Sequence, residues 1–135
     1  MSDFVLHPRL AEDSLLLARE SGCEVRLSKN AAFPWLLVVP EDGVEDLHEL
    51  TPERFRIVTE LIRDVSSFVA DYFEGEKLNV ACIGNMVRQM HIHIVSRSPA
   101  DPAWPGTVWG HDASGSYEPE RVEAIRVAFQ SRRAL

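Results

Sequence analysis

A chain of 135 residues is long enough to form one domain with a substantial hydrophobic core. Its net charge of −7 argues against a protein that grips a nucleic-acid backbone, because that affinity comes mainly from Lys and Arg. No stretch approaches the roughly 18 apolar residues that a membrane span needs, and we expect a cytoplasmic location without membrane partners. Cys23 and Cys82 match no metal or redox spacing, so we expect no disulfide.

The first half of the chain predicts a short helix followed by a pair of strands. No internal repeat or change of composition divides residues 1–135, so we expect a single domain with its core at about 4–110. Leucines are frequent in residues 8–20, and Gly22 follows them, which predicts a helix with a glycine stop. Residues 23–27 and 35–39 predict two antiparallel strands joined by a turn-rich connection.

The clearest predicted helix spans residues 52–74. Thr51 can cap it, Pro52 stands at the first helical position, and Gly75 supplies a stop. Apolar residues then recur every three or four positions, so one face should pack against a core. These residues are Phe55, Val58, Leu61, Ile62, Val65, Phe68, Val69 and Tyr72.

The second half predicts a hairpin, a long loop and a final helix. Residues 78–83 and 87–95 are predicted strands around a Gly84-Asn85 turn. A loop of about twenty residues rich in Pro and Gly follows, and loops of that length in compact domains are more often functional than idle. The last helix is predicted at about 118–132.

Two histidines stand two residues apart in the second predicted hairpin strand. Side chains of a strand alternate between faces, so Gln89, His91 and His93 should share the accessible face. The Cα atoms of residues i and i+2 are about 6.6 to 7 Å apart, which lets both imidazoles converge on one ligand atom.

Three interpretations of this histidine pair remain open from the residues alone. The histidines can be solvent-facing or hydrogen-bonded groups of an ordinary sheet. They can be metal ligands, but a third ligand is then needed, and the next carboxylates, Asp101 and Asp112, lie in the long loop. They can also serve nucleophilic catalysis, in which one imidazole attacks phosphorus while a carbonyl or side chain holds its other nitrogen.

The segment LNVACIGNMVRQMHIHIVSR at residues 78–97 resembles the signature of the histidine triad (HIT) family, where three histidines alternate with apolar residues. Two apolar residues after the last histidine set the register, so His91 takes the middle, nucleophilic position and His93 the last. Gln89 takes the first position, as in bacterial diadenosine tetraphosphate hydrolase-like members that the chain resembles. A neutral carboxamide exchanges no proton at neutral pH, so any acid–base role of that position is missing.

The resemblance also implies substrate-binding positions outside the histidine strand. Asn79 and the turn with Asn85 and Met86 resemble the family's segment beside the ribose and α-phosphate. Trp104 resembles the tryptophan segment that reaches the partner's site in dimeric members. Asn30 stands nearest to the family's acidic ribose ligand, although a carboxamide is a weaker hydrogen-bond acceptor than a carboxylate.

Over about residues 23–110 the resemblance implies an α+β, HIT-like fold and a nucleotide-directed activity. The expected fold is a five-stranded antiparallel sheet with a long and a short helix packed on it, plus a C-terminal helix. The expected protein is a homodimer that hydrolyses nucleoside phosphates or dinucleoside polyphosphates at the α-phosphate through a nucleotidyl-histidine, with no metal or other cofactor. A nucleotidyltransferase with the same intermediate, or a nucleotide-binding protein with little turnover, are the alternatives.

Overall fold

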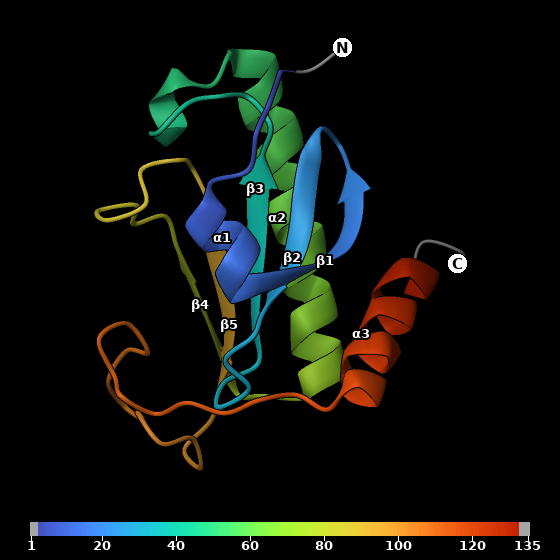
Figure 1. Ribbon diagram of the computed structural model, residues 1–135, viewed down its shortest axis with the longest axis vertical. Coiled ribbons are helices and arrows are strands. Elements are labelled where there is room, and N and C mark those ends of the chain that lie inside the picture. Colours follow the sequence, from blue (N-terminus) through green and yellow to red (C-terminus); the bar gives the residue numbers. More distant parts are fainter. Residues whose placement is uncertain (1–2, 133–135) are drawn as a thin grey trace.

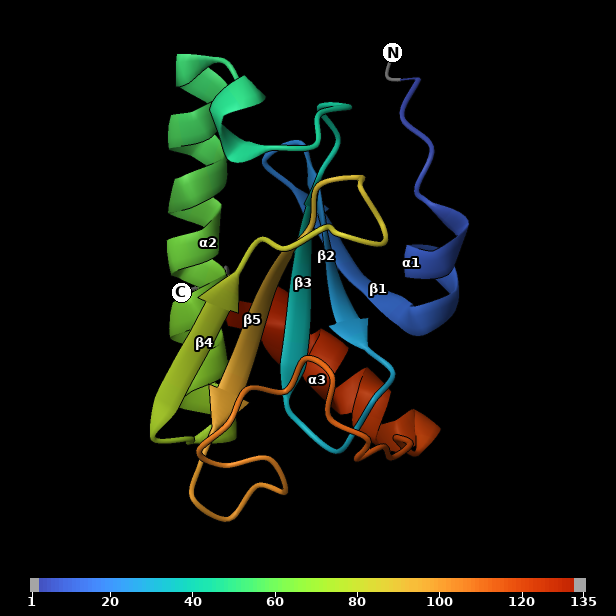
Figure 2. The ribbon, with the colours of Figure 1, turned by 90° about the vertical axis from the view of Figure 1, so that its left-hand side faces the viewer.

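The computed structural model describes residues 3–132, which fold around one five-stranded antiparallel sheet (Figure 1). Helices α2 and α1 lie on opposite faces of this sheet (Figure 2). The predicted α+β architecture is therefore confirmed. In sheet order the strands are β1 (Ser14–Glu20), β2 (Cys23–Ser28), β3 (Trp35–Pro40), β5 (Ile92–Arg97) and β4 (Lys77–Ala81).

Helix α2 (Pro52–Phe73) forms as the sequence predicts. The hydroxyl of Thr51 accepts a hydrogen bond from the backbone N–H of Arg54, at 3.2 Å, and so caps the first turn. Its apolar face packs on the sheet together with α3 (Pro119–Ser131), whose prediction is also confirmed. The buried residues that α2 contributes are Val58, Leu61, Val65, Phe68 and Val69.

The end of α2 differs from the prediction. Glu74, with a φ of 56°, adopts the left-handed conformation that closes the helix, and Gly75 does not. Gly75 serves close packing instead, because a Cβ there would lie 2.1 Å from Oγ of Ser96 and 2.9 Å from the carbonyl oxygen of Arg97. The glycine thus lets the chain pass directly beside β5.

The prediction of one helix over residues 8–20 is wrong beyond its first half. Helix α1 (Pro8–Asp13) stops where β1 begins, and β1 pairs with β2 from Ser14 opposite Ser28 to Glu20 opposite Cys23. Pairing gives the β1 backbone its hydrogen bonds while Leu17 is buried in the main core. This long-range gain outweighs the local preference of leucine for helix.

The predicted hairpin strand at residues 87–95 begins too early. Ala81 pairs with His93, and β5 starts only at Ile92, so residues 82–91 form an irregular loop between β4 and β5. Met90 directs its backbone N–H to the carbonyl oxygen of Val44, at 3.2 Å, in the segment that leads to the short 3-10 helix Leu47–Glu49. Met90 therefore bonds to the segment after β3, and it does not pair with a neighbouring strand of the sheet.

Within residues 3–132, no helix has the length and apolar character required to cross a membrane. Cys23 is buried, Cys82 is exposed, and both are free thiols. Burial raises the pKa of the Cys23 thiol to about 11, so it is un-ionised at neutral pH.

Candidate active site

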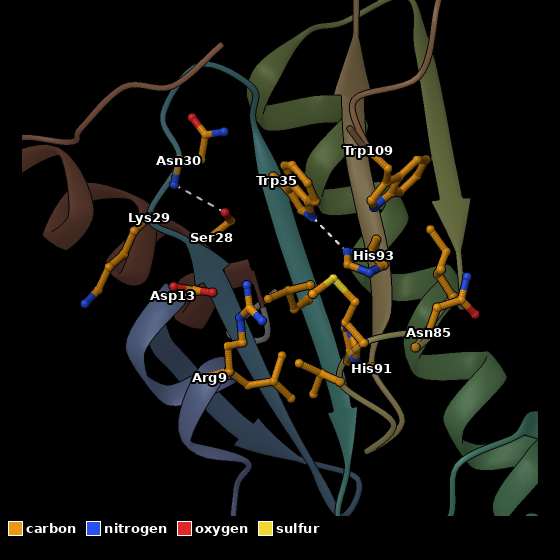
Figure 3. Close-up of a pocket in the computed structure, with 16 residues that line it drawn as sticks. Arg9, Asp13, Ser28, Lys29, Asn30, Trp35, Asn85, His91, His93 and Trp109 are labelled. Atoms are coloured by element: carbon orange, nitrogen blue, oxygen red, sulfur yellow. Dashed lines mark hydrogen bonds between the residues drawn. The ribbon is translucent and has the colours of Figure 1, made fainter. Parts of the chain in front are cut away.

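A cavity of about 590 Å³ opens on the sheet face opposite α2, and both histidines of the predicted triad line it (Figure 3). Strands β3 and β5 form its floor, and α1, the β2–β3 connection and the loop at 82–91 form its walls. Its lining is mostly apolar, with a few polar groups. The lining residues are Arg9, Leu10, Asp13, Ser28, Lys29, Asn30, Trp35, Leu37, Ile83, Gly84, Asn85, Met86, Val87, His91, His93 and Trp109.

His91 lies immediately before β5 and is held through one ring nitrogen. Its Nδ1 is 2.8 Å from the carbonyl oxygen of Gln89. A carbonyl only accepts hydrogen bonds, so Nδ1 carries the hydrogen in the neutral ring. Nε2 of His91 then keeps a lone pair, which is the state a nucleophilic imidazole needs.

His93 is held in the opposite tautomer. The indole Nε1 of Trp35 donates to Nδ1 of His93 at 3.1 Å, and an indole N–H is a donor only. Neutral His93 therefore carries its hydrogen on Nε2. Burial, with the neighbouring His91, lowers the pKa of His93 to about 4, so it is a neutral hydrogen-bond donor at physiological pH.

An aromatic wall surrounds His93. The ring centroids of His91 and His93 are 4.8 Å apart, and Trp109 lies 5.4 Å from His93 and 6.1 Å from Trp35. Within residues 3–132, the buried Nε1 of Trp109 has no hydrogen-bond partner. Sequence reasoning selected neither Trp35 nor Trp109 as a site residue, because no motif separates them from tryptophans that only anchor a loop.

Three of the predicted substrate-binding residues, Asn30, Asn85 and Met86, line the cavity. The carboxamide of Asn30 is already engaged. Its Oδ1 accepts from the N–H groups of Ala32 and Gly115, both at 3.1 Å, while Nδ2 donates to a third backbone group, the carbonyl oxygen of residue 113. Asn30 therefore ties the β2–β3 connection to the C-terminal loop.

The other predicted residues, Asn79, Trp104 and Gln89, are outside the lining. Oδ1 of Asn79 accepts from Nη1 of Arg97 at 2.7 Å, farther along the same face of the sheet. The Trp104 ring lies 5.8 Å from the Arg97 guanidinium carbon. The carboxamide of Gln89, in the loop before β5, bonds to the backbone of Val5 and His7, while His91 lines the cavity.

A charged wall faces the histidines across the cavity. Arg9 and Asp13 form this wall, because they are four residues apart on α1 and so lie on one side of that helix (Figure 3). Lys29 of the β2–β3 connection also lines the cavity, but its side chain extends away from the histidines (Figure 3). These three exposed side chains have no hydrogen-bond or ion-pair partner within residues 3–132. Sequence reasoning had no signal for this wall, because it depends on how α1 folds over the sheet.

The described residues, 3–132, contain no cluster of three or more His, Cys, Asp or Glu side chains arranged to hold a metal ion. His91 and His93 both line the cavity. Within residues 3–132, the ring nitrogens of these histidines that form hydrogen bonds are the two Nδ1 atoms, which leaves the two Nε2 atoms for a ligand of the cavity.

Comparison with known proteins places the chain in a family. The HIT domain model matches residues 9–100, and the chain belongs to this family, whose members are generally nucleotide hydrolases or transferases. A histidine triad protein from Sinorhizobium meliloti 1021 is 30% identical, with 96% of each chain covered and a TM-score of 0.91. One from Marinobacter aquaeolei VT8 is 36% identical, with 94% of this chain and 93% of the other covered and a TM-score of 0.89.

A third histidine triad protein, from Bradyrhizobium japonicum, is 31% identical with a TM-score of 0.90, covering 94% of this chain and 96% of the other. No curated protein matches the chain. Similarity over nearly the whole length thus shows the family and the fold. The substrate has to be inferred from the residues that line the cavity.

Proposed function

We propose that the chain hydrolyses dinucleoside polyphosphates or related nucleoside phosphates at the α-phosphate, through a covalent nucleotide on His91. The observation that carries the proposal is the complementary pair of tautomers. His91 offers an Nε2 lone pair, and His93 offers an Nε2 hydrogen within the same cavity. A nucleophile beside a neutral hydrogen-bond donor suits attack on a phosphate ester.

The proposed reaction has two displacements at phosphorus. Nε2 of His91 forms a bond to the α-phosphorus while the bond to the leaving phosphate oxygen breaks, and that oxygen leaves with the electron pair. Water then attacks the phosphoramidate: its oxygen bonds to phosphorus, one of its protons passes to bulk solvent, and the P–N bond breaks, so that its electron pair returns to Nε2 as the nucleoside monophosphate leaves. The His93 Nε2–H and backbone N–H groups of the lining residues Asn85 to Val87 stabilise charge on the phosphoryl oxygens.

The remaining predicted residues receive supporting roles in this proposal. Asn79 and Trp104 act through Arg97, which both contact, and so hold the end of β5 and the long loop. Asn30 shapes the β2–β3 connection, and Met86, at 78% exposed, is an apolar lining residue that a bound nucleotide can contact. No metal or other cofactor takes part in the proposed steps.

Product analysis in excess chelator tests this function. Incubation with a dinucleoside polyphosphate should release a nucleoside monophosphate at the same rate with and without chelator. Transfer of the nucleotide to added phosphate or a sugar phosphate would assign the protein as a nucleotidyltransferase, a possibility favoured by Arg9, which lines the cavity and has no side-chain partner within residues 3–132. Saturable binding without any product would make it a nucleotide-binding protein.

We also propose that the protein is a homodimer in which β4 pairs with its counterpart. β4 is an edge strand, and an edge left open is a template for pairing with another chain. Val80 and Ile83, at or just beyond the end of this strand, are 48% and 40% exposed. Sedimentation at micromolar concentration should give twice the monomer mass, and a monomer would count against the pairing.

Replacing Trp35 by Phe should slow turnover about tenfold at pH 8, because one hydrogen bond fixes the His93 tautomer. Without the indole donor, neutral His93 can place its hydrogen on Nδ1 and turn a lone pair toward the phosphate. Loss of the indole N–H at Nδ1 also removes a group that opposes protonation there, so the pKa of His93 should rise above about 4, although burial, the main cause of its low value, remains. Protonated His93 donates from Nε2 again, so the deficit should shrink at the acid end of the profile, as pH falls toward the pKa of His93 in the variant.

The pH–rate profiles of wild type and Trp35→Phe, taken as a ratio at each pH, check this prediction. Trp109→Phe is the matched control, since it removes an indole from the same wall but no hydrogen bond to His93. A deficit that is equal at every pH, or equal in both variants, would show that Trp35 only packs.

A further inference from the structure

Gln89, at the position of the first triad histidine, directs its side chain toward the N-terminal segment. Its Nε2 donates to the carbonyl oxygen of Val5 at 2.9 Å, and its Oε1 accepts from the backbone N–H of His7 at 2.8 Å. Both ends of the carboxamide are thus bonded to main chain more than 80 residues away in sequence. The carboxamide thus bonds to one C=O and one N–H of residues 5 and 7, as the backbone of a neighbouring strand does.

The segment held by Gln89 leads directly into α1, which forms a wall of the cavity. Nδ1 of His7 accepts from the N–H of Arg9 at 3.0 Å and caps the helix. Helix α1 has six residues, too few to be stable without external support, and it brings Arg9 and Asp13 to the cavity. The placement of that charged wall therefore depends on how residues 5–7 are held.

The backbone of Gln89 completes the connection to the nucleophile, because its carbonyl oxygen lies 2.8 Å from Nδ1 of His91. We propose that Gln89 is a positioning residue that ties the N-terminal segment and α1 to His91 and so sets the width of the substrate cavity. A carboxamide presents its donor and acceptor side by side, as an extended backbone requires. The two nitrogens of an imidazole diverge, so a histidine at this position would not hold both Val5 and His7.

Amide hydrogen exchange of the ligand-free protein tests the tie directly. Gln89→Met removes both hydrogen bonds at similar side-chain length, and Gln89→His restores the triad residue. Each should speed exchange at His7 and in α1 about tenfold. Gln130→Met is the matched control, since Gln130 also donates to main chain, the carbonyl oxygen of Leu17 at 2.8 Å, but lies away from the cavity.

Steady-state kinetics test the consequence for substrate, which rests on the proposed function. KM should rise about tenfold in Gln89→Met and Gln89→His, while kcat changes less than about threefold. The chemical step is largely kept because the carbonyl of residue 89, which fixes the His91 tautomer, remains in both variants. A structural weakening elsewhere, as in Gln130→Met, should leave KM unchanged.

The outcomes separate this inference from the proposed function. Unchanged exchange at His7 in Gln89→Met would overturn the tie, whatever the activity. A large fall in kcat with KM and exchange unchanged would place Gln89 in the chemistry and also overturn it. If wild-type protein turns over no nucleotide, the proposed function fails, and the exchange rates still decide whether Gln89 holds the segment.

Discussion

Replacing His91 by Ala should lower kcat/KM for a dinucleoside polyphosphate by about 10⁴-fold or more, because the variant has no atom on which the covalent intermediate can form. His91 is buried, at 7% exposed, and lines the cavity. Its Nε2 carries the lone pair available to a bound substrate. In the variant, water would have to act as the nucleophile, and no side chain would hold it in line with the leaving group. The measurement is initial rate against substrate concentration at pH 7 to 8.

Two companion variants make the His91 result specific. His93→Ala removes a hydrogen-bond donor to the phosphoryl group and should cost about 10²- to 10³-fold, yet still allow slow nucleotide transfer to His91. His48→Ala, at an exposed histidine of the short 3-10 helix, should leave the rate unchanged. Near-normal turnover by His91→Ala would rule out the covalent route.

Arg97→Met should destabilise the fold by about 3 to 5 kcal/mol, the range expected when one partner of a buried ion pair is removed. The arginine is 2% exposed and donates to both carboxylate oxygens of Asp101, at 2.8 and 3.1 Å. It also donates to Asn79 and to the carbonyl oxygen of Gly106, each at 2.7 Å. Urea unfolding at pH 7 measures the change in the free energy of unfolding.

The control for Arg97→Met is Arg88→Met. Nε of Arg88 lies 2.9 Å from Glu45, but the two side chains are 70% and 49% exposed, so the cost should stay below about 1 kcal/mol. Equal losses in both variants would mean that burial of the Arg97 network adds nothing.

The same network gives a pH dependence of stability. Hydrogen bonding to Arg97 is the main cause that lowers the pKa of Asp101 to about 2, below the ordinary value of 3.8. The stabilisation from this carboxylate is therefore complete above pH 4 and is lost as pH falls toward 2. In Arg97→Met the pKa of Asp101 should rise toward 3.8, so this contribution and its loss between pH 4 and 2 should largely disappear, which acid titrations at fixed urea concentration can follow.

The elements that the sequence predicts correctly are those with local signals. Thr51 and Pro52 mark the start of α2, and the three- and four-residue spacing of its apolar residues continues to the end of the helix. The strand pair at residues 23–27 and 35–39 also forms, with Cys23 opposite Pro40 and Leu27 opposite Leu36. In these segments the local preference and the packing of the whole domain agree.

The predictions that fail depend on contacts distant in sequence. Residues 14–20 look helical by composition, yet β2 supplies a partner that turns them into β1. Residues 87–91 alternate like a strand, but Met90 bonds to Val44, and Gln89 bonds to Val5 and His7. Periodicity alone does not show which partner a backbone will find.

The candidate site divides in the same way. The pattern around His91 and His93 was sufficient to select both residues, because a short spacing in one segment places them together. The groups that define their chemistry come from elsewhere: Trp35 from the neighbouring strand and Trp109 from the long loop. The charged wall with Arg9 likewise requires α1 to lie across the sheet, which no local pattern indicates.

Intact-protein mass spectrometry after a brief incubation with a dinucleoside polyphosphate, quenched without acid because phosphoramidates of histidine are acid-labile, tests the covalent route most directly. We expect a gain in mass of one nucleoside monophosphate less water, present in wild type, absent in His91→Ala, and located on His91 by peptide mapping. Product release by wild type with no adduct at any time point, or an adduct on another residue, would contradict it.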